Sequence, residues 1–232
     1  MKTALVICPG RGTYNKPELG YLARHFPDPV LLEEFDRKRA AAGSETLSAL
    51  DGAARFSTAM HTRGDNASAL IYAASLGDAL SIDRDAIEIV AVTGNSMGWY
   101  TALACAGALS AGDGFDLVDT MGALMQRALI GGQLVFPHVA DDWRPDPARK
   151  AELLALVAEI GARADHELAL SIDLGGMLVL AGNEAGLAAF EAAVPRLDNR
   201  FPMRLANHAA FHTALQAPVA EMGRARLDPE RF

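Results

Sequence analysis

The stretch "AIEIVAVTGNSMGWYTALACAGALS", residues 86–110, decides the fold. Its first part is a run of mostly branched apolar residues, typical of a buried strand, and its last part is rich in small residues, typical of a helix. Between them stands Gly94-Asn95-Ser96-Met97-Gly98, a G-x-S-x-G pattern. Such a serine either caps the helix within a tight turn or projects as a nucleophile from a strained elbow.

The elements around this stretch follow the order of an open α/β sheet. Residues 3–8, "TALVIC", predict a buried strand that ends at Pro9-Gly10. Residues 66–80 predict a well-buried helix, and two more helices are expected over 99–109 and 115–130. This order of elements, strand, helices, strand, elbow and helix, is typical of a parallel sheet with helical crossovers.

A smaller subdomain is expected to be inserted into this α/β domain. Residues 131–205 predict strand, helix, strand, strand, helix and strand, with a tight turn at Gly175-Gly176. This order is that of a split βαβ, ferredoxin-like subdomain. The predicted fold is therefore an α/β protein with a parallel-sheet, α/β-hydrolase-like core, formed by residues 1–130 and 206–232, and an inserted ferredoxin-like subdomain at 131–205.

Composition restricts the function classes. The chain has 232 residues and a formal net charge of −8, which argues against a nucleic-acid partner. Its two cysteines, Cys8 and Cys105, lie in apolar runs, without the spacing of a disulfide framework or a metal site. No apolar run approaches the roughly 20 residues of a membrane span, and the N-terminal one is too short for a signal peptide. We expect a cytoplasmic protein with no metal, no bound cofactor and no membrane partner.

A serine nucleophile needs a base, because its hydroxyl is a poor nucleophile at neutral pH. His208 and His212 lie together in "LANHAAFHTALQAP", after a predicted strand and at a helix start. Catalytic groups gather at strand ends in open α/β sheets, but spacing alone does not choose between these two. The other four histidines are expected at the surface: His25, His61, His138 and His166.

Four segments form a recognisable set: "CPGRGTY" at 8–14, "GNSMGWYTALACAGALS" at 94–110, "LVDTMGALMQ" at 117–126 and "AFHTALQAPVA" at 210–220. They resemble, in the same order, the "PGQGSQ", "GHSLGEYTALVAAGALS", "LVxxRGxLMQ" and "AFHTxLMxPA" motifs of malonyl-CoA:acyl-carrier-protein transacylases and of the acyltransferase domains of fatty-acid and polyketide synthases. The resemblance spans nearly the whole chain and implies a ferredoxin-like subdomain at the predicted place.

The resemblance implies roles for individual residues. Ser96 would be the nucleophile, and His212 the general base and acid. The backbone N–H groups of Met97 and Arg11 would bind the oxyanion, and Asn66 falls where the family often has a glutamine that lines the site. The implied activity is transfer of an acyl group from acyl-CoA to the phosphopantetheine thiol of an acyl carrier protein, through an acyl-serine intermediate.

Departures from the family pattern bear on the substrate. Met121 stands where malonyl-specific members have an arginine that pairs with the malonyl carboxylate, so an acyl group without a free carboxylate is expected. Asn95 replaces the elbow histidine and is expected to border the substrate, and Trp99 would either narrow the pocket mouth or pack on the inserted subdomain. The resemblance also implies a further C-terminal part, with a residue that orients the base, whereas this sequence ends about twenty residues after His212.

Two other functions remain open from the sequence. A thioesterase or other α/β-hydrolase also uses G-x-S-x-G, with an acidic residue between serine and histidine, for which Asp165 or Asp173 could serve. A non-catalytic module that binds acyl-CoA or a carrier protein would explain the lost arginine. Retention of both Ser96 and His212 favours the enzyme.

Overall fold

The computed structural model describes residues 1–140, 142–228 and 230. The chain divides into two compact units, each with its own hydrophobic core. Unit 1 comprises Met1–Gln126 and the chain from Gly223 onward, and unit 2 is Arg127–Met222. The sequence placed the inserted subdomain at 131–205, whereas residues 206–222 group with unit 2 in the structure.

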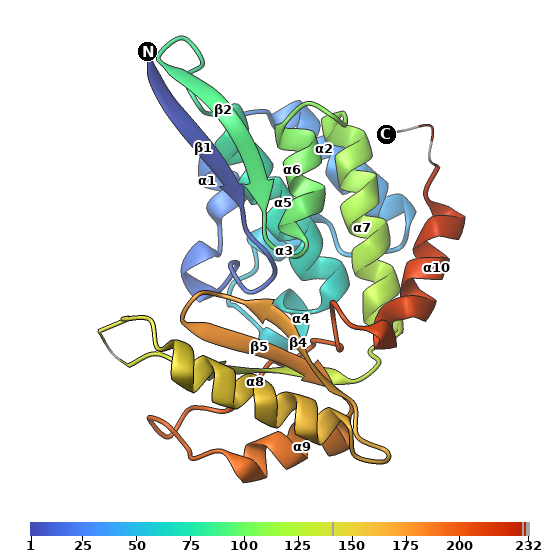
Figure 1. Ribbon diagram of the computed structural model, residues 1–232. Coiled ribbons are helices and arrows are strands. Elements are labelled where there is room, and N and C mark those ends of the chain that lie inside the picture. Colours follow the sequence, from blue (N-terminus) through green and yellow to red (C-terminus); the bar gives the residue numbers. More distant parts are fainter. Residues whose placement is uncertain (141, 229, 231–232) are drawn as a thin grey trace. The chain divides into compact units, whose positions relative to one another are not determined.

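Unit 1 holds a two-stranded parallel sheet with helices on one side of it (Figure 1), and Leu5, Ile7 and Val90 on its strands are exposed, although the sequence predicted buried strands. Strands β1 (Lys2–Cys8) and β2 (Ile87–Gly94) pair in register from Leu5 opposite Ala91 to Cys8 opposite Gly94. The helical elements before β2 are η1 (Lys16–Glu18), α1 (Tyr21–His25), α2 (Pro29–Ala41), α3 (Leu47–Asp51), α4 (Thr58–His61) and α5 (Gly64–Leu80). Those after it are α6 (Gly98–Cys105) and α7 (Ala111–Arg127).

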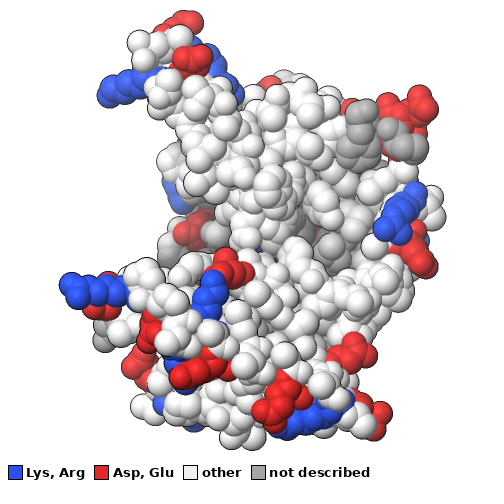
Figure 2. All heavy atoms as spheres, in the orientation of Figure 1, with Lys and Arg blue, Asp and Glu red and all other residues white. Residues whose placement is uncertain are grey.

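The core of unit 1 is aromatic and aliphatic. Phe35 of α2 stacks on Phe115 of α7 with ring centroids 4.3 Å apart, and Tyr72 of α5 meets both rings edge-on. Helix α5 is buried almost all round, as its sequence predicted. Figure 2 shows charged side chains at the far end of the β1–β2 sheet, whereas the visible face over α6 and α7 carries few.

Unit 2 is a four-stranded antiparallel sheet with two helices on one face (Figure 1). Its elements are β3 (Gly132–Pro137), α8 (Pro147–Gly161), β4 (Leu168–Asp173), β5 (Met177–Gly182), α9 (Glu184–Ala193), β6 (Met203–Arg204) and η2 (Ala214–Gln216), followed by α10 (Ala217–Arg226), which the division between the units crosses. The strand order β4-β5-β3-β6 is the ferredoxin-like order.

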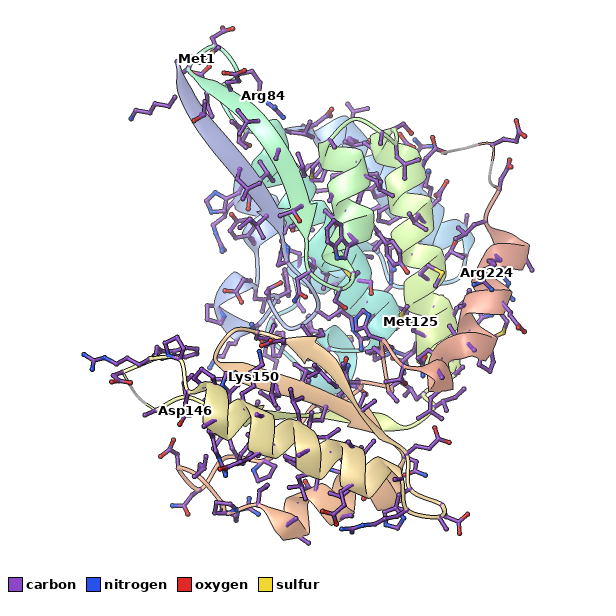
Figure 3. All side chains as sticks on the ribbon, viewed as in Figure 1. Met1, Arg84, Met125, Asp146, Lys150 and Arg224 are labelled. Carbon is purple, nitrogen blue, oxygen red and sulfur yellow. The ribbon has the colours of Figure 1, made fainter. Side chains whose placement is uncertain are left out.

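Local chemistry defines the ends of the unit 2 elements. Asp146 caps α8 by accepting a hydrogen bond from the Arg149 N–H at 2.9 Å, and Asn183 caps α9 in the same way. Lys150 lies in the first turn of α8 (Figure 3) and forms an ion pair with Asp173 at the end of β4. The predicted turn at Gly175-Gly176 joins β4 to β5, with Gly175 at φ +81°.

The predicted fold class is confirmed: the chain is α/β, with a parallel sheet and a separate antiparallel sheet. Two of the four histidines expected at the surface are instead buried, since His61 is 0% exposed and His138 is 5% exposed. Both ring nitrogens of His61 are engaged by backbone groups, so its burial is satisfied. Within the described residues, no helix is long and apolar enough to cross a membrane.

Candidate active site

Ser96 lies on a sharp turn between β2 and α6. The strand ends at Gly94 and the helix begins at Gly98, so only three residues connect them. Ser96 has φ +54°, in the left-handed region that residues with a Cβ rarely adopt. A left-handed residue at a strand-to-helix junction is the backbone geometry of a nucleophile elbow, and Met97 rather than Ser96 occupies the N-cap position of α6.

Both glycines of the elbow are required by close backbone contacts. A Cβ on Gly94 would lie 2.2 Å from the carbonyl carbon of Gly98. A Cβ on Gly98 would lie 2.1 Å from the carbonyl oxygen of Cys8, at the end of β1. The G-x-S-x-G spacing therefore lets strand β1, strand β2 and helix α6 meet at backbone distance directly below Ser96.

The loop after β1 packs on the same elbow. The Asn95 N–H donates to the Cys8 carbonyl at 3.0 Å, and a Cβ on Gly10 would lie 3.2 Å from the Ser96 Cβ. Arg11 follows Gly10 directly, and Met97 precedes the first turn of α6. The structure thus brings Ser96 together with the two segments whose backbone N–H groups the sequence nominates for the oxyanion, and the partial positive charge at the start of α6 favours an anion there.

The side chain of Arg11 leads away from the elbow toward α5 and α7. A Cβ on Gly64 would lie 2.8 Å from Arg11 Nη1 and 3.4 Å from Gln126 Oε1. Burial lowers the pKa of the Arg11 guanidinium to about 10, so the group remains cationic at neutral pH. A partly buried cation therefore lies between the N-terminus of α5 and the C-terminal half of α7.

Met121 and Asn66, both predicted to line the substrate, are buried in unit 1. Met121 is 7% exposed, and a Cβ on Gly223 would lie 2.9 Å from its sulfur, so the thioether packs on the Gly223 backbone. The side-chain amide of Asn66 donates to the Met60 carbonyl at 3.0 Å and accepts from Arg39 Nη2 at 2.6 Å. Both polar ends of Asn66 are thus engaged by the protein.

The residues that flank Ser96 in sequence are more open. Asn95 is exposed, with its backbone oxygen accepting from the Gly98 N–H at 2.8 Å. Trp99 is 57% exposed. A large aromatic surface close to Ser96 in sequence is therefore available for contact with a bound molecule.

The two candidate histidines lie on one loop of unit 2, after β6. His212 has φ +60° and keeps an exposed surface, while the protein atoms around it remove enough water to lower its imidazole pKa below the usual value. Its neutral form, the one that can accept a proton, therefore persists to lower pH. His208 Nδ1 instead lies 2.8 Å from Gln133 Oε1, a contact that occupies this imidazole within the unit.

The sequence analysis did not nominate three residues that the structure places in polar networks: Arg39, Gln133 and Ser171. Arg39 is 0% exposed and forms an ion pair with Asp119, and burial is the main reason that the Asp119 pKa is raised. Gln133 and Ser171 lie on unit 2 strands and hydrogen bond to one another near His212. A polar residue inside an apolar strand was the only available signal for Gln133. The described part of the chain contains no cluster of three metal-binding side chains.

The fold and the elbow define a class of protein: an α/β protein with a serine raised on a strained strand-to-helix turn beside a glycine loop. No family model matches the sequence. A curated protein, the malonyl CoA-acyl carrier protein transacylase of Haemophilus influenzae, is 25% identical over 232 residues, covering 95% of this chain and 68% of that protein.

Solved structures share the fold. A malonyl-CoA:acyl carrier protein transacylase from Xanthomonas oryzae pv. oryzae superposes with a TM-score of 0.72 at 24% identity, covering 98% of this chain and 71% of the other. A malonyl-transacylase in complex with its type II polyketide-synthase acyl-carrier protein gives a TM-score of 0.72 at 21% identity, covering 97% and 69%. The resemblance to the malonyl-CoA:acyl-carrier-protein transacylases is thereby confirmed, and with it the prediction of an acyltransferase-type enzyme.

Proposed function

We propose that this protein transfers an acyl group from acyl-CoA to the phosphopantetheine thiol of an acyl carrier protein, through an ester on Ser96. The observation that carries the proposal is the backbone of Ser96, held at φ +54° on an elbow that leaves no room for a Cβ at Gly94 or Gly98. Such strain persists only where the surrounding structure enforces it, and it is typical of a nucleophile on an elbow.

The reaction proceeds in two half-reactions. Ser96 Oγ attacks the thioester carbonyl while His212 accepts the hydroxyl proton, and the N–H groups of Met97 and Arg11 stabilise the oxyanion. The carbon–sulfur bond then breaks, and the CoA thiolate leaves with the proton from His212. In the second half-reaction the carrier thiol loses its proton to His212 and attacks the ester, and Ser96 Oγ regains that proton as it leaves.

Two separate observations support the proposed acceptor and the proposed acyl group. The curated relative is named for transfer to an acyl carrier protein, and one related structure is a complex with such a carrier, which supports a carrier as the acceptor. The acyl group is restricted by Met121, because a free carboxylate placed against a thioether would lose hydration without gaining a cation. We therefore propose an acyl group without a free carboxylate, such as acetyl, as the preferred substrate.

Mass spectrometry after mixing with a panel of acyl-CoAs tests the proposal. We expect an adduct of the acyl mass on Ser96, which disappears in Ser96→Ala and remains in the control Ser81→Ala, an exposed serine at the end of α5. Transfer of the label to a phosphopantetheinylated carrier completes the cycle.

The other functions that the sequence left open are outcomes of the same experiment. Release of free acid faster than any carrier is loaded would replace transfer by thioester hydrolysis. Saturable binding of acyl-CoA with no adduct across the panel would replace catalysis by binding alone.

A further inference from the structure

The loop that carries His212 contains two residues with left-handed backbone. His212 has φ +60° and Asn207, five residues earlier, has φ +58°. Asparagine tolerates this region well, whereas for His212 the left-handed φ costs free energy that other contacts must offset. The direction of the His212 side chain is therefore set by whatever holds residues 207–212 in place.

One anchor is the end of the chain segment before β3. The Ile130 carbonyl accepts from the Ala210 N–H at 2.8 Å and from the Gln216 side chain at 3.1 Å. The Thr213 hydroxyl donates to the Ala210 carbonyl at 2.7 Å and closes the turn over His212. These bonds fix residues on both sides of His212 but not the peptide group that joins it to Phe211.

A second anchor holds that peptide group. The Ser171 hydroxyl donates to the Phe211 carbonyl at 2.9 Å, and Gln133 Nε2 donates to Ser171 Oγ at 2.7 Å. Gln133 Nε2 also lies 3.5 Å from the same Phe211 carbonyl. Because this carbonyl belongs to the peptide bond that precedes His212, its orientation restricts the φ angle of His212 directly.

Strand β4 is irregular at the point where Ser171 lies. Its pairing with β5 shifts register between Leu170 and Ile172, so Ser171 is the extra residue of a β-bulge. Bulges re-aim a side chain out of the regular alternation of a strand. Here the re-aimed hydroxyl reaches the Phe211 carbonyl, 40 positions along the chain.

The protons of the network can be assigned from its acceptors. Ser171 donates its only hydrogen to a carbonyl, so it accepts from the amide nitrogen of Gln133. The Gln133 oxygen then faces His208 Nδ1 at 2.8 Å and can only accept, so Nδ1 carries a proton. Gln133 is 3% exposed, and both ends of its side chain are satisfied.

We propose that Gln133 and Ser171 are positioning residues that hold the His212 backbone, and with it the imidazole, in the single orientation that the proposed reaction uses. This inference rests on the proposed function, in which His212 is the base. It also assigns a role to His208, whose hydrogen bond to the Gln133 oxygen fixes the orientation of the Gln133 amide. The residues that orient the proposed base would then all belong to unit 2.

Removal of one hydroxyl tests the inference. We expect Ser171→Ala to slow acylation of Ser96 roughly 10- to 100-fold, as measured by rapid-quench mass spectrometry, with KM for the acyl-CoA nearly unchanged. The low-pH limb of the acylation rate should move to higher pH, because a less restrained imidazole is better hydrated. Ser171→Thr keeps the hydroxyl, and we expect it to restore rate and pH profile.

Two further variants separate positioning from general loss of stability. Asn183→Ala removes the cap of α9 in the same unit, and we expect it to lower the melting temperature while leaving acylation rate and pH profile as in the wild type. Gln133→Leu should reproduce the Ser171→Ala kinetics. If Gln133→Leu does not fold, Ser171→Ala, which removes a single oxygen, decides the matter.

The outcomes distinguish this inference from the proposed function. Wild-type protein that forms no adduct on Ser96 contradicts the function. Wild-type protein that acylates normally, together with Ser171→Ala of equal rate and equal pH profile, contradicts the inference alone. A slower Ser171→Ala that Ser171→Thr does not restore also contradicts it, since the hydroxyl would then not be what matters.

Discussion

At position 121 the chain carries a thioether where the malonyl-specific proteins that it resembles carry a guanidinium. Met121 is buried on α7 against Gly223, so its side chain is fixed rather than free to move aside. An arginine can pair with a carboxylate through two parallel hydrogen bonds, and a methionine cannot. We therefore propose that this one side chain decides between acyl groups with and without a free carboxylate.

Introducing the missing cation should change that choice. We expect Met121→Arg to raise kcat/KM for malonyl-CoA relative to acetyl-CoA by roughly 10- to 100-fold, since a hydrogen-bonded ion pair contributes about 1.5–3 kcal/mol. Met125→Arg, one turn further along α7 (Figure 3), adds the same charge and serves as the control. An unchanged ratio in Met121→Arg would remove this residue from the account of specificity.

For Asn66, the sequence suggested a role but not the contacts of its side chain. The resemblance nominated it as a substrate contact, and that stays a prediction. The structure shows both ends of its amide bonded to Arg39 and Met60. Arg39 lies 27 positions away, and no local periodicity predicts that a charged side chain on an ordinary amphipathic helix turns fully inward.

At the scale of elements, the β2–α6 elbow was the most predictable part of the molecule. Apolar strand, glycines and a small-residue helix follow directly in sequence, and each acts locally. What the sequence did not contain was the second partner of the turn, because the contact of Gly98 with the Cys8 carbonyl joins segments 90 residues apart. The last predicted strand of the inserted subdomain is short in the structure: β6 is only Met203–Arg204, because Phe201 bridges Leu197 instead of pairing with β3.

The elbow contact predicts a steep cost for one added methyl group. We expect Gly98→Ala to lower the free energy of unfolding by about 2–3 kcal/mol and to abolish acylation, because its Cβ would overlap the Cys8 carbonyl. Gly107→Ala should cost only about 1–2 kcal/mol, since Gly107 has φ +78° but nothing within 4 Å of its added Cβ. Urea unfolding of both variants measures the difference, and equal losses would contradict the steric argument.

At the scale of the whole molecule, each unit is built around its own aromatic pair. Phe35 stacks on Phe115 in unit 1, and Phe136 meets Phe190 edge-on at 5.6 Å in unit 2. The order of elements predicted both units, because each element pattern is local. The extent of unit 2 was not predictable, because residues 206–222 are tied to it by side-chain bonds such as that between Gln216 and the Ile130 carbonyl.

Separate cores imply separate responses to damage. We expect Phe190→Ala, at a 0% exposed site, to cost about 3–5 kcal/mol and to raise amide hydrogen exchange throughout residues 127–222. Exchange in α5 of unit 1 should remain as in the wild type. Mass-spectrometric exchange measurements test this, and an equal rise in α5 would show that the two units open together.

The left-handed backbone at Ser96 and His212 has a consequence for how this protein can be altered. A glycine would relieve the strain at either position, so variants chosen only for heat tolerance would be drawn to replace these two side chains. Under the proposed function both side chains are needed for acyl transfer, so selection for activity would oppose these replacements. A programme of thermostabilisation would then have to measure acyl transfer at each round, because its most stable products would otherwise be inactive.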